Sequence, residues 1–223
     1  MRRSLLVVAA AAVAGVAAKK AIDPWQRNWG ATSAEVDAAL PGDELTPTPN
    51  EQCTRAITIE ATPDDVWPWL VQMGADRGGF YSYDWLENLF ALDIHNADRI
   101  VGDWQQLDVG DMVWANGART GGWVVELLVP NEALVMKMAD PATRRAATRS
   151  EGFGFEFQWT FALQRTAGDR TRLIIRERTA YGRRSTRLLM APVGLASFVM
   201  TRKMLGGIQR RAESAPARRT DTA

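Results

Sequence analysis

The stretch FGFEFQWTFAL, Phe153 to Leu163, decides the fold class of this 223-residue chain. Its odd positions are all Phe, Trp or Leu, and its even positions are small or polar. A period of two with one apolar face is typical of a strand in an antiparallel sheet that is buried on one side. The alternation predicts a strand from Phe153 to Arg165. Segments separated by turn residues predict four more strands: Asp111 to Ala115, Trp123 to Val129, Ala133 to Met138 and Arg172 to Tyr181.

Helices are predicted on both sides of these strands. The run TPDD at Thr62 suits a helix start, because Thr can cap, proline fits the first helical position, and acidic residues favour a helix N-terminus. After a first strand at Arg55 to Ala61, apolar spacing predicts three helices: Thr62 to Met73, Tyr83 to Leu92 and Pro192 to Arg211. In the second helix Trp85, Leu89 and Leu92 form one row, which we expect on the buried side of an amphipathic helix.

The order of these elements predicts an α+β fold. An antiparallel sheet with one apolar face needs a cover, and the long final helix is the natural one. Two short helices follow the first strand, and the remaining strands form the sheet that curves around the C-terminal helix. A curved sheet around one helix need not fill completely, so a ligand cavity is expected between them.

This order resembles the START-like superfamily, also called SRPBCC, which includes polyketide cyclase/dehydrase-like and lipid-transfer proteins. The resemblance is carried by ITIEATPDDVWPWL, Ile57 to Leu70. Shorter runs resemble a bacterial group within it, many of whose members have an N-terminal hydrophobic segment: WGAT at Trp29, LPGDEL at Leu40, QMG at Gln72, RGGFYSYDWLEN at Arg77 and ADRI at Ala97. The resemblance covers roughly Trp29 to Ala212. It implies a helix-grip fold with a hydrophobic cavity, and it transfers no catalytic motif.

Composition excludes several classes of function. With one cysteine, Cys53, and one histidine, His95, the chain cannot build a disulfide framework or a zinc site with several His or Cys ligands. No serine-hydrolase elbow, dinucleotide fingerprint, phosphate-binding loop or zinc-protease motif occurs. We therefore expect no cofactor and no metal. The body of the chain is acidic and both ends are basic, which disfavours nucleic acid as a partner and suits an anionic membrane.

The chain divides into four parts. Residues 1–22 are basic, then apolar from Ser4 to Ala18, then basic again. They suit a membrane anchor, which we favour, or a secretory signal cleaved after Ala18. Residues 23–52 contain four prolines and a short helix at Ser33 to Leu40, and are expected to be a loosely packed tether. Residues 53–212 form the START-like domain, and residues 213–223 a disordered tail.

Three functions remain open. We favour a membrane-associated binder of a small hydrophobic molecule or lipid, over an acid-base enzyme of the polyketide cyclase/dehydrase type or a non-catalytic interaction domain with a filled core. His95, Tyr81 and Arg77 are the weak catalytic candidates, since proton transfer and enolate stabilisation need such groups. Asp84 and Glu87 fit better as helix-capping or solvated residues. The expected ligand-binding residues are Trp69, Met73, Arg77, Phe80, Tyr81, Tyr83, His95, Arg99, Trp123 and Trp159.

Overall fold

The computed structural model describes residues 24–89, 91–150, 154–183, 185–186 and 193–214. The predicted anchor or signal at 1–22 lies outside these residues, as do Phe153 and most of the predicted tail. In the described part of the chain, no helix is long and apolar enough to cross a bilayer.

One antiparallel sheet of seven strands forms the centre of the molecule. Its order is β1-β7-β6-β4-β3-β2, and β5 pairs with β4. The strands are β1 (Glu51–Ile59), β2 (Met112–Trp114), β3 (Gly122–Val129), β4 (Ala133–Asp140), β5 (Arg145–Ala146), β6 (Phe155–Thr166) and β7 (Arg170–Tyr181). Every strand predicted from the sequence is present, with ends displaced by a few residues. The hairpin of β6 and β7 is the longest pairing, because its register runs over twelve residue pairs without a bulge.

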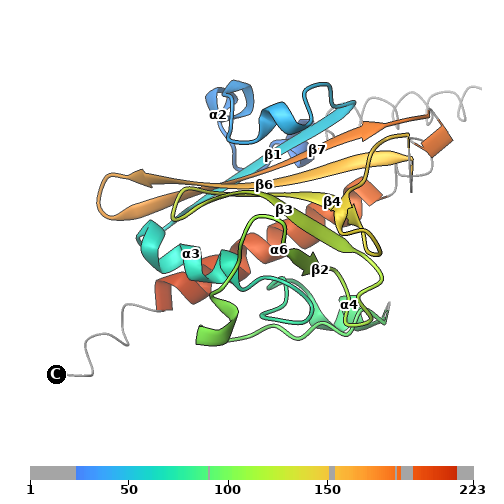
Figure 1. The fold of residues 1–223 in the computed structure, drawn as a ribbon. Coiled ribbons are helices and arrows are strands. Elements are labelled where there is room, and N and C mark those ends of the chain that lie inside the picture. The colour runs from blue at the N-terminus through green and yellow to red at the C-terminus, as the bar shows by residue number, and fades with distance from the viewer. Residues whose placement is uncertain (1–23, 90, 151–153, 184, 187–192, 215–223) are drawn as a thin grey trace, which may run out of the picture.

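The helices lie in two layers on opposite sides of the sheet (Figure 1). The helix α6 (Val193–Ser214) runs along the inner face, together with α3 (Pro63–Val71) and α4 (Asp84–Leu89). The opposite, outer face carries α2 (Ser33–Asp37) and the short 3-10 helix η1 (Asp43–Leu45), and a second 3-10 turn, η2, spans Gly102–Trp104. The fold is therefore α+β and helix-grip-like, as the sequence predicts.

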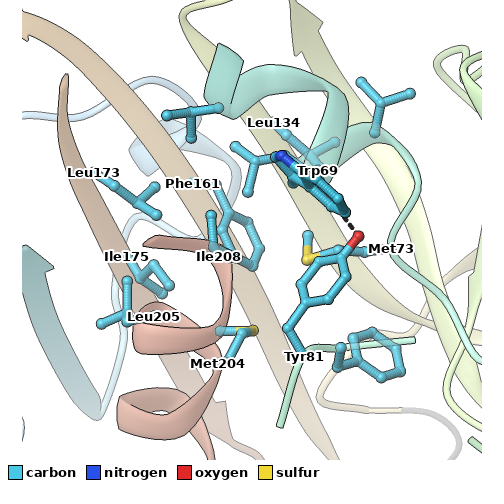
Figure 2. Close-up of a cluster of buried hydrophobic side chains, with 14 of the residues drawn as sticks. Trp69, Met73, Tyr81, Leu134, Phe161, Leu173, Ile175, Met204, Leu205 and Ile208 are labelled. Carbon is cyan, nitrogen blue, oxygen red and sulfur yellow. Dashed lines mark hydrogen bonds between the residues drawn. The ribbon is translucent and has the colours of Figure 1, made fainter. Parts of the chain in front are cut away.

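The inner face is a continuous apolar core. Met204, Leu205 and Ile208 of α6 are at most 2% exposed and point toward the sheet (Figure 2). Gly207 permits this close approach, because a Cβ there would meet the carbonyl oxygen of Tyr81 at 2.3 Å. The sheet supplies the facing side chains Leu134, Phe161, Leu173 and Ile175, all at most 1% exposed. Burial of this apolar area is the main stabilising contribution to the fold.

The outer face carries many polar side chains and a small buried apolar cluster, Leu40, Ala56, Ala162 and Ile174, and it is covered as well. Residues 23–52 were expected to be a loosely packed tether, and residues 24–50 lie on this face, where several hydrogen bonds and ion pairs hold them. Arg176, 1% exposed, donates to the carbonyl oxygens of Glu35, Val36 and Ala38, and it lies 2.6 Å from an Asp43 carboxylate oxygen. Buried polar groups are tolerated only when bonded, so the outward arginines of β7 hold this segment against the sheet.

The helix α4 is turned the other way from the prediction. Trp85 is 69% and Leu89 71% exposed, so these two members of the predicted row face solvent, whereas Leu92, which lies beyond the end of α4, packs against the core. The polar row holds the helix in place: Asn88 donates to the Ile94 carbonyl and accepts from its N–H, at 3.0 and 2.8 Å. Asp84 accepts from the side chain of Asn96. These bonds fix the polar side of α4 against the following loop, and Trp85 and Leu89 are left outside.

Candidate ligand-binding site

Four aromatic side chains gather at the inner faces of β3 and β6. Trp159 of β6 and Trp123 of β3 have ring centroids 5.3 Å apart, and Phe80 lies 5.7 Å from Trp123 and 6.2 Å from Trp159. Phe157 adds a further edge contact to Trp159 at 6.4 Å. Trp159 is 9% exposed, while Trp123 and Phe157 are half-buried. Along the inner side of β6, Phe161 is fully buried and Phe157 is the more exposed side chain, whereas Phe155 is again buried at 8% exposed.

Three indole N–H groups in this layer are buried without a partner. The Nε1 atoms of Trp69, Trp123 and Trp159 receive no hydrogen-bond acceptor from the described residues. An indole nitrogen is only a donor, and a buried donor without a partner costs about 1–3 kcal/mol. Buried tryptophans usually find a partner. Trp123 and Trp159 lie in the same aromatic cluster, with ring centroids 5.3 Å apart, so two of the three unpaired donors belong to neighbouring rings.

A buried charged cluster adjoins the aromatic one. The strand register pairs Glu177 of β7 with Trp159 on one side and Cys53 of β1 on the other. Glu177 lies 2.9 Å from the guanidinium of Arg55, which is 2% exposed. From α6, Ser197 donates to both carboxylate oxygens at 3.1 and 2.8 Å, and Thr201 donates at 2.9 Å. This cluster joins the sheet to the first half of α6.

Sequence reasoning missed Arg55 and Glu177 as interior residues. The signal was present, because both occupy inward positions of alternating strands, in register with Ile57 and Ile175. Each charge is compensated by the other and by hydroxyl groups, as burial of an ion pair requires. The Glu177 carboxylate makes all of these contacts to residues of the same chain. We therefore assign the cluster a structural role, which is to connect β7 to α6.

Cys53 is the neighbouring thiol. Burial, followed by the nearby Glu177 carboxylate, raises the pKa of the Cys53 thiol to about 11. The thiolate is the nucleophilic form, so Cys53 is poorly reactive at neutral pH. This position gives no support to thiol chemistry at the site.

Tyr81 lies at the crossing of three elements. Its backbone has a positive φ of 58°, its ring is 1% exposed, and its hydroxyl donates to the Trp69 carbonyl at 2.9 Å (Figure 2). The Arg211 guanidinium of α6 covers the ring at 4.9 Å. Burial raises the pKa of the Tyr81 hydroxyl well above its usual range. These contacts give Tyr81 a packing role and hold its proton on the oxygen.

The loop from Arg77 to Gly79 is explained by backbone geometry. Gly74 and Gly79 exchange backbone hydrogen bonds at 3.1 and 2.8 Å, which closes a tight turn. A Cβ on Gly78 would meet Gln72 at 2.9 Å, so only glycine fits beside that buried amide. Arg77 donates to the carbonyl oxygens of Val71 and Gln106 at 3.4 and 3.0 Å. Arg77 therefore ties the turn to its neighbours.

The remaining predicted site residues lie outside the aromatic cluster. The side chain of His95 is 81% exposed, and its ring is 3.2 Å from Asp93. Arg99 is exposed, and Tyr83 is half-buried beneath Lys203. Thus the structure brings together Trp69, Met73, Phe80, Tyr81, Trp123 and Trp159, and it separates His95 and Arg99 from them. An exposed His95 and a buried Tyr81 do not form an acid-base pair.

An open groove of about 610 Å³ lies at another place, on the outer side of the sheet. It runs between residues 39–41, the start of α3, the β3–β4 turn and residues 162–165. Its polar side chains bond one another: Asn131 donates to Asp64 at 2.8 Å, and Arg165 donates to Asp64 at 3.3 Å. These mutual hydrogen bonds give no indication that the groove binds a ligand. Across the described residues, no group of three His, Cys, Asp or Glu side chains is placed to hold a metal ion.

No family model matches the sequence, and no curated protein matches it. Among solved structures, a hypothetical protein of Helicobacter pylori aligns with a TM-score of 0.49 and 12% identity, over 79% of this chain and 96% of its own. DynU16, a protein in the dynemicin biosynthetic locus, aligns with 0.42 and 16%, over 75% of this chain and 49% of its own. A Chromobacterium violaceum protein aligns with 0.43 and 11%, over 73% and 96%. All three TM-scores are below 0.5, so neither the fold assignment nor the function draws on these alignments.

Proposed function

We propose that this protein binds a small hydrophobic molecule or lipid that carries a hydrogen-bond acceptor, such as a carbonyl oxygen. The ligand would lie between the sheet and α6, against Phe80, Trp123 and Trp159. The N-terminal segment would tether the domain to a membrane. We also propose membership of the START-like superfamily, which rests on the sequence resemblance together with the helix-grip arrangement.

The pair of unpaired indole donors carries this proposal. Aromatic rings supply large apolar contact area, and a ligand oxygen would satisfy the Nε1 groups of Trp123 and Trp159. Small-molecule sites are usually lined mostly by apolar side chains, with a few convergent polar groups. An acid-base reaction finds less support, because His95 is exposed and Tyr81 is engaged in packing.

Native mass spectrometry of the purified full chain tests whether a hydrophobic molecule co-purifies. A fluorescent titration then tests the acceptor: prodan is a naphthalene probe with a carbonyl group, and N-phenyl-1-naphthylamine lacks one. Trp159→Phe should weaken prodan binding about tenfold, the equivalent of one hydrogen bond of ~1.4 kcal/mol, and should leave the second probe unaffected.

Trp114→Phe is the matched control, since Trp114 is 8% exposed on β2 and its indole is not among the unpaired donors. It should change the affinity of neither probe. A protein that carries no ligand and binds neither probe overturns the proposal. If Trp159→Phe lowered the affinity for both probes equally, the result would support an apolar site and would contradict the proposed hydrogen bond.

A further inference from the structure

The exposed row of α4 is one part of a larger surface. Trp85 and Leu89 lie one helical turn apart and are 69% and 71% exposed. The Trp85 ring contacts Tyr83 edge-on at 6.4 Å, and Tyr83 in turn lies under Lys203 of α6, whose Nζ is 5.2 Å from the ring centroid. Exposed apolar groups that cluster in this way mark a contact surface.

The surface continues on the other flank of α6. The adjacent residue Arg202 reaches toward the N-terminal residues, and its guanidinium lies 5.1 Å from the ring centroid of Trp29. Trp25, 54% exposed, contacts Phe198 of α6 at 5.2 Å, next to Val199, which is 40% exposed. Aromatic side chains therefore lie on both flanks of the outward strip of α6, each flank with its own basic residue. We call Trp25, Trp29, Tyr83, Trp85, Arg202 and Lys203 the aromatic–basic strip.

This combination fits the interface of a lipid bilayer. Trp and Tyr are enriched at the level of the headgroups, and Lys and Arg extend their charges toward anionic phosphates while their stems remain in apolar surroundings. Each basic residue near an anionic surface contributes about 1 kcal/mol. Trp85 and Leu89 have the size and exposure to enter the headgroup region.

The course of the chain gives an independent argument. The described structure begins at Pro24, directly before Trp25 of the strip. The apolar run Ser4 to Ala18 ends seven residues before Trp25, a span of at most about 25 Å when fully extended. If that run is held in a bilayer, this flank of the strip is kept within reach of the bilayer surface.

We propose that the aromatic–basic strip is a docking face for an anionic membrane surface. It orients the domain so that the first half of α6 and α4 face the lipid. The membrane tether is part of the proposed function, so this inference rests on it, while the ligand site is measured separately. The docking face gives a role to Trp85 and Leu89, the two apolar side chains of α4 that the hydrogen bonds of Asn88 and Asp84 leave outside.

The test uses the full chain in vesicles of phosphatidylcholine with or without phosphatidylglycerol. In a Cys53→Ser background, Trp85→Cys and Val199→Cys are each labelled with an environment-sensitive NBD dye, and quenching by nitroxide lipids is measured. Gln164→Cys is the control, exposed on the outer side of the sheet. Labels at 85 and 199 should shift to the blue and be quenched, more strongly with phosphatidylglycerol, and the label at 164 should not.

The charge is tested by Arg202→Glu with Lys203→Glu, against Arg210→Glu farther along the same helix. The double variant should remove the phosphatidylglycerol dependence, and the control should retain it. Labels at 85 and 199 that stay as water-exposed as the label at 164 overturn the docking face. A second result would also overturn it: labels that are shielded in detergent without lipid, in a protein whose copies can be cross-linked to one another. That result would make the strip a subunit interface. Prodan titration of the same samples reports the ligand site independently.

Discussion

The two faces of β7 lie against different kinds of cover. Inward, Leu173 and Ile175 meet the apolar side of α6, whereas outward, Arg172, Arg176 and Arg178 meet the N-terminal segment through ion pairs. Both faces are well covered, since Ile175 and Arg176 are each 1% exposed. Alternation therefore reports which face is apolar, and it does not report which face is buried.

The difference follows from what each cover can satisfy. A continuous helix has bonded its own backbone, so α6 can offer only side chains and covers an apolar surface by packing. The short helix α2 (Ser33–Asp37) ends beside β7, and the last carbonyl oxygens of a helix have no partner within it, so they are free to accept from arginine. Arg176 takes three of them, and Lys137 donates to the Leu45 carbonyl at 3.0 Å. The C-terminal end of a helix and a row of cations are complementary for this reason.

The largest expected effect comes from emptying the inner face. Phe161→Ala removes a ring that is 0% exposed from the middle of the core, and should lower the free energy of unfolding by about 3–5 kcal/mol. Urea unfolding followed by circular dichroism measures it. Gln164→Ala, exposed on the same strand, should stay within about 0.5 kcal/mol. A loss below ~1 kcal/mol for Phe161→Ala would mean that the inner face is loosely packed.

The next largest effect should come from the outer face. Asp43→Ala leaves Arg176 and Arg178 without the carboxylate that lies 2.6 and 2.7 Å away, and an uncompensated buried charge costs about 3 kcal/mol or more. The cost should be local, so hydrogen exchange of residues 33–46 should rise before that of β7. Glu44→Ala, an exposed acid beside it, is the control. Uniform exchange throughout the sheet would show that the outer cover and the core unfold as one unit.

A smaller effect is expected for the polar contact inside the inner layer. Tyr81→Phe keeps the ring and removes the donor to the Trp69 carbonyl, at a cost of about 1–2 kcal/mol. Tyr83→Phe, with a half-buried ring, should remain near zero. The thermal midpoint of each variant measures the difference. If Tyr81→Phe preserved stability yet abolished a turnover, the packing role given to Tyr81 would be incomplete and the enzyme hypothesis would return.

The sequence predicted the fold because the strands and α6 have strong periods. The alternation of β6 and the apolar spacing of α6 are local signals, and both elements formed near their predicted ends. The outer cover was not predictable in this way, since Arg176 and Asp43 are separated by more than a hundred residues and arginine on a strand normally indicates solvent. In α4 the apolar row was recognised, but its direction depends on bonds that Asn88 and Asp84 make to a later loop.

For the candidate site, the sequence identified the aromatic residues, but it could not show which of them come together in the folded structure. Phe80, Trp123 and Trp159 come from three distant segments and meet only through the sheet register. The unpaired state of the indole nitrogens depends on what fails to lie nearby, for which no sequence pattern exists. The RGGFY run was singled out for its glycines, and their reason is the tight turn beside Gln72.

The smallest expected effect is a pH dependence of stability that the outer face has and the inner face lacks. The hydrogen bond from Arg172 is the largest influence on Glu35 and lowers the pKa of its carboxyl from 4.5 to about 2. A carboxyl with a lowered folded-state pKa stabilises the fold above its unfolded pKa, and this contribution is lost as the pH falls from about 4.5 toward 2.

Glu35→Gln should therefore be less stable than the parent at pH 7, and the difference should shrink across that acidic range. Urea midpoints at several pH values measure it, with Glu44→Gln as the exposed control. Because the apolar core cluster around Phe161 contains no carboxyl group, Phe161→Ala should keep the same deficit across this acidic range wherever the protein folds. A Glu35→Gln deficit that is equally constant would remove Glu35 from the ionic cover.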